Sequence, residues 1–174
     1  TLGLREPPRA VIIGRAEEGS ESKVLSGILN SDGTGGEFFS QPIGGAVTPI
    51  TASHIENDEQ FMLMKGKEMF KVATRTLAEN AQKVITEAGL TLADVDWVIP
   101  HQANIRIIET TAKLIGLEMD KMVVNIQNYG NTSAATVPIA FHEAIMDGRI
   151  KRGDIVLFDA FGAGLTAGAT LLKY

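Results

Sequence analysis

Three stretches of the sequence follow apolar runs and carry groups that could stabilise an anion. His101 follows the run VDWVIP, Asn131 ends the stretch NYGN after MVVNIQ, and Gly162–Gly164 follow the run DIVLFDAF. An imidazole, a carboxamide and backbone N–H groups are hydrogen-bond donors that can stabilise negative charge as it develops in a reaction. Each feature also has a structural explanation, as a turn histidine, a turn asparagine beside a helix, and a tight turn between strands. The residues alone do not separate these two interpretations.

The elements expected around these stretches would bring them together. From residue 61 onwards, apolar residues spaced three or four apart predict helices, and these alternate with short apolar runs that predict strands. This order predicts an α/β fold with a mixed, mostly parallel sheet, helices on both faces and one closing antiparallel hairpin. Because the carboxyl ends of parallel strands meet at one edge of a sheet, the three stretches should converge on one pocket. The expected helices span 61–88, 104–116 and 133–148, and the expected strands span 95–100, 122–131, 152–164 and 165–174.

The first sixty residues are less regular. Residues 1–9 contain two adjacent prolines and no periodic pattern, which is typical of a leader. Strands are expected at 10–17 and 23–33, and the two could pair as a hairpin. Residues 31–60 are rich in glycine and polar residues. So long an irregular stretch is typical either of a lid or binding loop or of a surface excursion.

Composition excludes several classes of function. The net charge of −5 disfavours general binding to the phosphate backbone of nucleic acids. The 174 residues include no cysteine, so the chain has no disulfide, no thiolate metal ligand and no cysteine nucleophile. Its three histidines, His54, His101 and His142, lie too far apart for a zinc-binding motif, so no metal site is expected. Without a long apolar run or the apolar core of a signal peptide, the chain is expected to be cytoplasmic and free of membrane contact.

Basic residues form a row on this acidic chain. Lys67, Lys71 and Arg75 recur every four residues along the expected helix, and Arg106 and Lys113 are one heptad apart on the next helix. Such a row is usually an ordinary solvated helix face. On a protein of net negative charge it can instead form a local positive surface that receives an acidic partner.

Four motifs, in the same order along the chain, resemble a single enzyme family. They are MKGKEMFKVA (64–73), IPHQANIRII (99–108), NYGNTSAATVP (128–138) and AFGAGLTAG (160–168). Together they resemble the C-terminal half of β-ketoacyl-acyl carrier protein synthase III, a condensing enzyme with the thiolase fold. The resemblance implies a C-terminal thiolase-like domain at 61–174, with a mixed, mostly parallel five-stranded sheet. It also implies that the strands within 10–60 are remnants of an N-terminal half, preceded by the unmatched leader at 1–9.

The resemblance implies a reaction and a role for each site residue. The family joins an acyl-CoA primer to malonyl-acyl carrier protein by decarboxylative Claisen condensation, at the start of fatty-acid synthesis and without a cofactor. His101 and Asn131 would stabilise the enolate that forms when carbon dioxide leaves, and the backbone N–H of Ala163 would belong to the oxyanion hole. The resemblance also assigns Gly66, Phe70, Ile107 and Phe161 to the substrate channel, and Lys71, Arg106 and Lys113 to the docking of acyl carrier protein. The complete protein would be a homodimer.

The chain departs from the family pattern at several points. The family has a glycine at the position of Ala163 and often a large aromatic residue at that of Ala167, so substrate shape or rate could differ. The nucleophilic cysteine belongs to an N-terminal half that this sequence does not contain, so we expect one piece of a larger enzyme, inactive in condensation alone. The alternatives are a related polyketide or quinolone condensing enzyme, or a non-catalytic fragment that binds the carrier protein.

Overall fold

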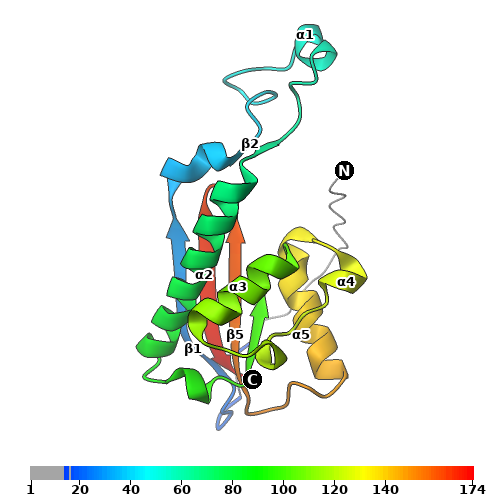
Figure 1. Cartoon of the computed structure of the whole chain (residues 1–174). Helices are drawn as coiled ribbons and strands as arrows, with labels where there is room; N and C mark the ends of the chain where they lie inside the picture. The colour runs from blue at the N-terminus through cyan, green and yellow to red at the C-terminus, as the bar shows by residue number, and fades with distance from the viewer. Residues whose placement is uncertain (1–13, 16) are drawn as a thin grey trace.

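The centre of the protein is one four-stranded sheet with the strand order β1-β6-β5-β4. The computed structural model describes residues 14, 15 and 17–174. Strand β5 pairs in parallel with β4 and antiparallel with β6, which in turn pairs antiparallel with β1. Three strands therefore run in one direction and β6 runs in the other, as the prediction of a mixed α/β sheet requires (Figure 1). The strands are β1 (Lys23–Ser31), β4 (Trp97–Pro100), β5 (Ile155–Gly162) and β6 (Thr166–Lys173).

The expected fifth strand, at 122–131, is wrong. Only an isolated parallel bridge joins Met122 to Val98, with the N–H of Val123 donating to the carbonyl of Val98 over 2.8 Å. The next bond of a parallel ladder would come from the N–H of residue 100, but this residue is a proline and has none. The chain then leaves the sheet and forms the short helix α4 (Ile126–Tyr129).

Helices cover both faces of the sheet, as predicted. Helices α2 (Gly66–Glu87) and α3 (Ile105–Ile115) lie on one face (Figure 1). There they form a core with buried Val98 and Leu157. Helix α5 (Thr136–Met146) packs on the opposite face, against the neighbouring strand residues Ile99 and Val156. Successive strand residues thus supply two separate cores, which is the period of two expected for a sheet buried on both sides.

The stretch between β1 and α2 is an excursion from the body, extending past the end of α2 in Figure 1. It contains the 3-10 helix η1 (Gly33–Phe38), α1 (Ala52–Glu56) and the paired short strands β2 (Phe39–Ser40) and β3 (Leu63–Met64). The predicted helix at 61–88 therefore begins later, at Gly66, because residues 63 and 64 pair with β2. The leader at 1–9 and most of the strand expected at 10–17 lie outside the described residues.

Among the described residues, no helix is both long and apolar enough to cross a membrane.

The remaining described elements are single turns that connect the layers. The connecting turns are the 3-10 helices η2 (Leu92–Asp94), η3 (Met119–Lys121) and η4 (Ser133–Ala135).

Candidate active site

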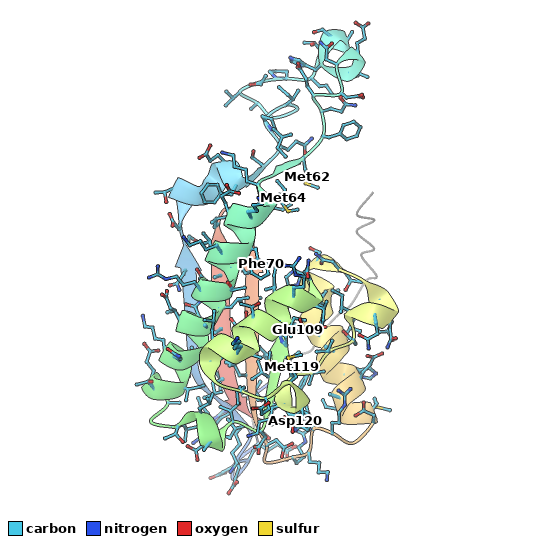
Figure 2. The ribbon with its side chains drawn as sticks, in the orientation of Figure 1. Met62, Met64, Phe70, Glu109, Met119 and Asp120 are labelled. Carbon is cyan, nitrogen blue, oxygen red and sulfur yellow. The ribbon has the colours of Figure 1, made fainter. Side chains whose placement is uncertain are left out.

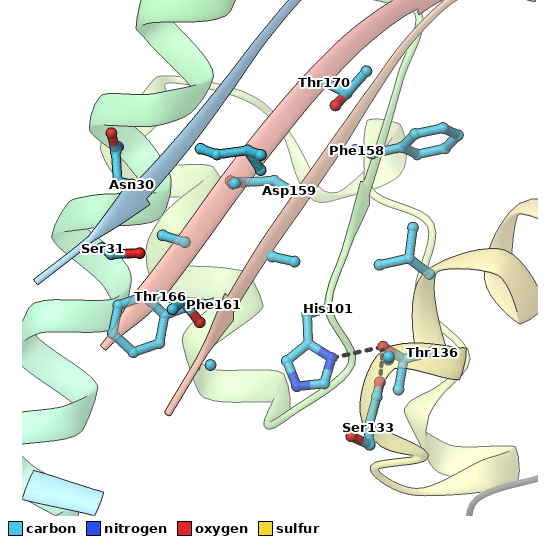
Figure 3. Close-up of a pocket in the computed structure, with 17 residues that line it drawn as sticks. Asn30, Ser31, His101, Ser133, Thr136, Phe158, Asp159, Phe161, Thr166 and Thr170 are labelled. Atoms are coloured by element: carbon cyan, nitrogen blue, oxygen red, sulfur yellow. Dashed lines mark hydrogen bonds between the residues drawn. The ribbon is translucent and has the colours of Figure 1, made fainter. Parts of the chain in front are cut away.

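His101 lies at the carboxyl end of β4, where two of its groups are held in place. Its backbone N–H donates to the carbonyl of Asp159 over 2.8 Å, so the residue continues the parallel pairing of β4 with β5. Its ring atom Nδ1 lies 2.6 Å from the hydroxyl oxygen of Thr136, at the start of α5 (Figure 3). Burial lowers the pKa of His101, because desolvation disfavours the imidazolium. The ring is therefore neutral at pH 7.

The ring of His101 faces a cavity of about 680 Å³. The cavity lies over the face of the sheet on which α5 packs, and small residues keep that face open, including Ala160, Gly162 and Gly168. A Cβ on Gly168 would lie 3.2 Å from the backbone carbonyl oxygen of Ile28, so glycine there favours the close approach of β1. The site is thus a hollow with one titratable ring at its rim, open to a ligand of moderate size.

Asn131 lies in the loop between α4 and α5 and is not among the residues that line this cavity. Its Oδ1 accepts the N–H of Ser133 over 2.9 Å, which orients the carboxamide and leaves its NH₂ group for another partner. Two residues that sequence reasoning did not select, Ser133 and Thr136, line the cavity instead. Both belong to the motif NTSAAT that follows the glycine of NYGN, and this motif was the available signal.

A buried glutamine next to His101 positions the loop at 123–125, which leads into α4. Gln102 is fully buried, and its Nε2 donates to the carbonyls of Pro100 and Val123 over 2.7 Å and 3.1 Å. Its Oε1 accepts the N–H of Asn125 over 3.1 Å. The side chain of Asn125 in turn donates to Glu143 of α5 over 2.8 Å. The end of β4, the loop and α5 are therefore joined by side-chain hydrogen bonds around the histidine.

The glycine-rich turn closes the hairpin of β5 and β6. Phe161 and Gly162 line the cavity, whereas Ala163 is exposed outside it, and its carbonyl accepts the hydroxyl of Thr166 over 3.1 Å. Backbone bonds of 2.7 Å and 2.8 Å between Asp32 and Leu165 fix the turn to the end of β1. The structure therefore brings His101 and Phe161 to one cavity and leaves Asn131 and Ala163 at neighbouring positions.

A second hollow, of about 590 Å³, lies between α2 and the start of α3. Gly66, Phe70 and Arg106, three of the residues selected from the sequence, line it together with Lys67 and Asn104. Phe70 lies on α2 (Figure 2), and the guanidinium of Arg106 lies over its ring, 5.8 Å from the centroid. Ile107 is partly buried and does not line this hollow. Lys71 and Lys113 are exposed residues of the two helices and also lie outside its lining.

No group of three or more metal-ligating side chains gathers anywhere in the described part of the chain. Among the residues that line the first cavity, only His101 and Asp159 titrate. Burial raises the pKa of the Asp159 carboxyl well above its usual range, so this group adds little negative charge to the site. The chemistry that the described residues can offer here is hydrogen bonding and proton transfer at the imidazole.

Known proteins match most of this chain. Two proteins named β-ketoacyl-[acyl-carrier-protein] synthase III, from Natranaerobius thermophilus and Caldanaerobacter subterraneus, are 41% and 43% identical to this chain over 166 and 165 residues. Each alignment covers 95% of this chain, which spans about half the length of these relatives. The crystal structure of 3-oxoacyl-[acyl-carrier-protein] synthase III from Aquifex aeolicus has a TM-score of 0.79 at 41% identity, covering 92% of this chain and 46% of that one.

A sequence model of one family covers more than half of the chain. It describes the C-terminal part of 3-oxoacyl-[acyl-carrier-protein] synthase III and matches residues 85–174. This range includes the end of β4, the loop with Ser133 and the β5–β6 hairpin, which line the first cavity together with the end of β1 outside the range. The expected thiolase-like fold is confirmed by the structural matches. The chain therefore belongs to the 3-oxoacyl-[acyl-carrier-protein] synthase III family, of which it contains the C-terminal region.

Proposed function

We propose that this chain is the decarboxylating half of an enzyme that condenses an acyl-CoA primer with malonyl-acyl carrier protein. The observation that carries the proposal is the placement of His101, fixed at the end of β4 with its ring facing an open cavity. Acyl-CoA and acyl carrier protein are the substrate and the partner in this proposal. Residues 61–174 form its thiolase-like unit, and the complete cytoplasmic enzyme is a homodimer.

The reaction needs donors for one developing negative charge. When the carboxylate of the malonyl group leaves as carbon dioxide, the electron pair of the broken carbon–carbon bond moves towards the thioester carbonyl oxygen. Hydrogen bonds from His101 and from the free NH₂ group of Asn131 stabilise the enolate oxygen. The enolate carbon then attacks the acyl thioester carbonyl, the carbon–sulfur bond breaks, and the thiolate that carried the primer leaves and takes up a proton. Removal of one such donor costs about 10²- to 10³-fold in rate.

The acyl group needs a nucleophile that these residues do not provide. The sequence has no cysteine, so the thiol that carries the primer comes from polypeptide outside these 174 residues. The backbone N–H of Ala163 is then a donor to the oxyanion of that acyl thioester. Its β-carbon narrows the turn relative to glycine, which affects the shape of primer that fits.

Basic residues around the second hollow are suited to an acidic carrier protein. Arg106 lines the hollow, and Lys71 and Lys113 are exposed on the same two helices. Gly66 and Phe70 line the hollow beside these charges, where the prosthetic group of the carrier protein or of coenzyme A can enter. Opposite charges on the two surfaces attract each other and raise the rate of association, and salt weakens this attraction.

The test is carbon dioxide release from malonyl-acyl carrier protein by the chain combined with the cysteine-bearing part of its enzyme. We expect His101→Ala to reduce the rate by about 10²-fold or more. His142→Ala, on the exposed face of α5, is the matched control and should retain the rate. Unchanged decarboxylation with intact carrier binding would favour a non-catalytic binding module.

Two further experiments test the alternatives. A panel of primers distinguishes fatty-acid initiation from polyketide or quinolone synthesis. Incubation of this chain alone with labelled acyl-CoA should leave it unacylated.

A further inference from the structure

The hydroxyl of Thr136 lies between two polar groups and has only one proton. Its oxygen lies 2.9 Å from the carbonyl oxygen of Ser133 and 2.6 Å from Nδ1 of His101 (Figure 3). A carbonyl oxygen can only accept, so a hydrogen bond on that side requires the hydroxyl proton. An imidazole nitrogen can accept or donate, depending on the tautomer of the ring.

Both contacts are satisfied together by one arrangement of protons. The hydroxyl donates to Ser133, and its oxygen accepts a proton from Nδ1 of His101. A neutral imidazole carries a single N–H, so the proton on Nδ1 leaves Nε2 without one. In Figure 3 this second nitrogen lies on the side of the ring away from Thr136. The ring itself lines the cavity.

We propose that Thr136 is a positioning residue that holds the single proton of neutral His101 on Nδ1, so that Nε2 enters the cavity as an acceptor. The proposal rests on the proposed function for its role in the reaction, and it refines the part played by the histidine. A bare Nε2 cannot donate to the enolate oxygen. The ring becomes a donor there only after Nε2 has taken up a proton.

Thr136 is suited to both protonation states of the ring. In the imidazolium both nitrogens donate, and the threonine oxygen accepts from Nδ1 as before, so neither the ring nor the hydroxyl needs to move. The malonyl group carries a carboxylate, and a negative charge beside an imidazole favours its protonated form. Binding of this anion therefore draws a proton from water to Nε2 and converts the acceptor into a donor.

The opposite arrangement has the hydroxyl donating to Nδ1, with the ring proton on Nε2. This arrangement is possible because the carbonyl of Ser133 also accepts the backbone N–H of Thr136, so the carbonyl keeps one partner when the hydroxyl turns towards Nδ1. It leaves the described residues with one hydrogen bond fewer, since the hydroxyl then makes one contact instead of two. One buried hydrogen bond of typical net strength corresponds to about a fivefold population difference in favour of the proposed tautomer.

The experiment is nitrogen NMR of the ¹⁵N-labelled chain, recorded well above pH 6.5 so that the ring is neutral. We expect Nδ1 of His101 to resonate as the protonated nitrogen and Nε2 as the unprotonated one. Thr136→Val keeps the shape but removes the acceptor, and should shift the ratio about fivefold towards the Nε2–H tautomer. Thr136→Ser restores the hydroxyl and should restore the original ratio. Thr132→Val is the matched control, since the Thr132 hydroxyl is buried in the same loop and has no partner among the described residues.

A wild-type chain with its proton on Nε2 would overturn the proposal, whatever the variants do. An unchanged ratio in Thr136→Val would also overturn it, because the hydroxyl would then not set the tautomer. Both results are measured from the ¹⁵N resonances of the His101 ring and do not depend on catalytic turnover. If the tautomer is as proposed and His101→Ala leaves decarboxylation unchanged, then the proposed function fails and the assignment of Thr136 stands.

Discussion

Replacing Asp159 by asparagine should change how the stability of this protein depends on pH. Asp159 is only 1% exposed, and neither carboxyl oxygen has a side-chain hydrogen-bond partner within the described residues. Alternation along β5 places it with Leu157, on the face covered by α2 and α3. Burial without a charged partner disfavours the carboxylate, and this raises the pKa of Asp159 well above its usual range.

The sign and size of the effect follow from proton linkage. The folded protein keeps the proton of Asp159 at pH values where the unfolded chain, with a pKa near 3.8, has lost it. Unfolding then releases a proton, so the free energy of unfolding falls as the pH rises between the unfolded and the folded pKa. The slope for one proton is about 1.4 kcal/mol per pH unit. Asparagine has no proton to release, so below the folded pKa the free energy of unfolding of Asp159→Asn should rise by about this much per pH unit relative to that of wild type.

Urea unfolding from about pH 5 to about pH 7 measures the effect as a difference between the variant and wild type. The buried amide has its own cost of about 1–3 kcal/mol, but that cost is the same at every pH. The difference also cancels the contribution of His101, whose lowered pKa acts on both proteins alike. Asp120→Asn, at an exposed position of η3 (Figure 2), is the control for the same substitution outside the core. A constant difference for Asp159→Asn would refute the reasoning, because it would mean that the folded protein holds Asp159 ionised.

Two further substitutions test the elements that position the site. Gln102→Leu leaves buried backbone groups without partners, each worth about 1–3 kcal/mol, and should lower the urea midpoint without changing the slope m, whereas exposed Gln127→Leu should not. Gly168→Ala places a Cβ 3.2 Å from the backbone carbonyl of Ile28 and should cost about 1–3 kcal/mol in thermal unfolding. Gly27→Ala, where the nearest atom lies 3.6 Å away, should cost less, and equal costs would show that strand packing does not exclude a side chain at residue 168.

Local sequence patterns correctly predicted those helices and strands whose ends depend only on residues close to them in the sequence. The helix expected at 104–116 is α3, and it ends at Gly116, which adopts the left-handed conformation that glycine tolerates. The strand that ends before His101 and the closing hairpin of β5 and β6 were also predicted correctly. In each case, apolar periodicity and a following turn residue lie within a few positions of each other, so no distant partner needs to be known.

The errors arose where a distant partner decides the structure. The apolar run at 122–124 has the composition of a strand, but its neighbour in the sheet is β4, which presents a proline where a donor is needed. Thr136 was not selected, although it lies in the motif NTSAAT, because the motif does not show which of its hydroxyls meets the histidine. Its importance comes from a ring 35 residues earlier in the chain. The burial of Asp159 likewise depends on α2 and α3, which cover that face of the sheet.

The sequence Pro100-His101-Gln102 both ends the parallel pairing of β4 and determines where the partner of His101 lies. Pro100 ends the parallel ladder because it has no N–H, and this frees the chain after Val123 to leave the sheet. Gln102 supplies the missing donor to the carbonyl of Val123, so this buried carbonyl keeps a partner at the break. The chain that leaves the sheet is the one that brings Ser133 and Thr136 to the ring of His101. A continuous fifth strand would have carried residues 125–131 along the sheet instead, so the interruption of the sheet is what places the partner of the histidine.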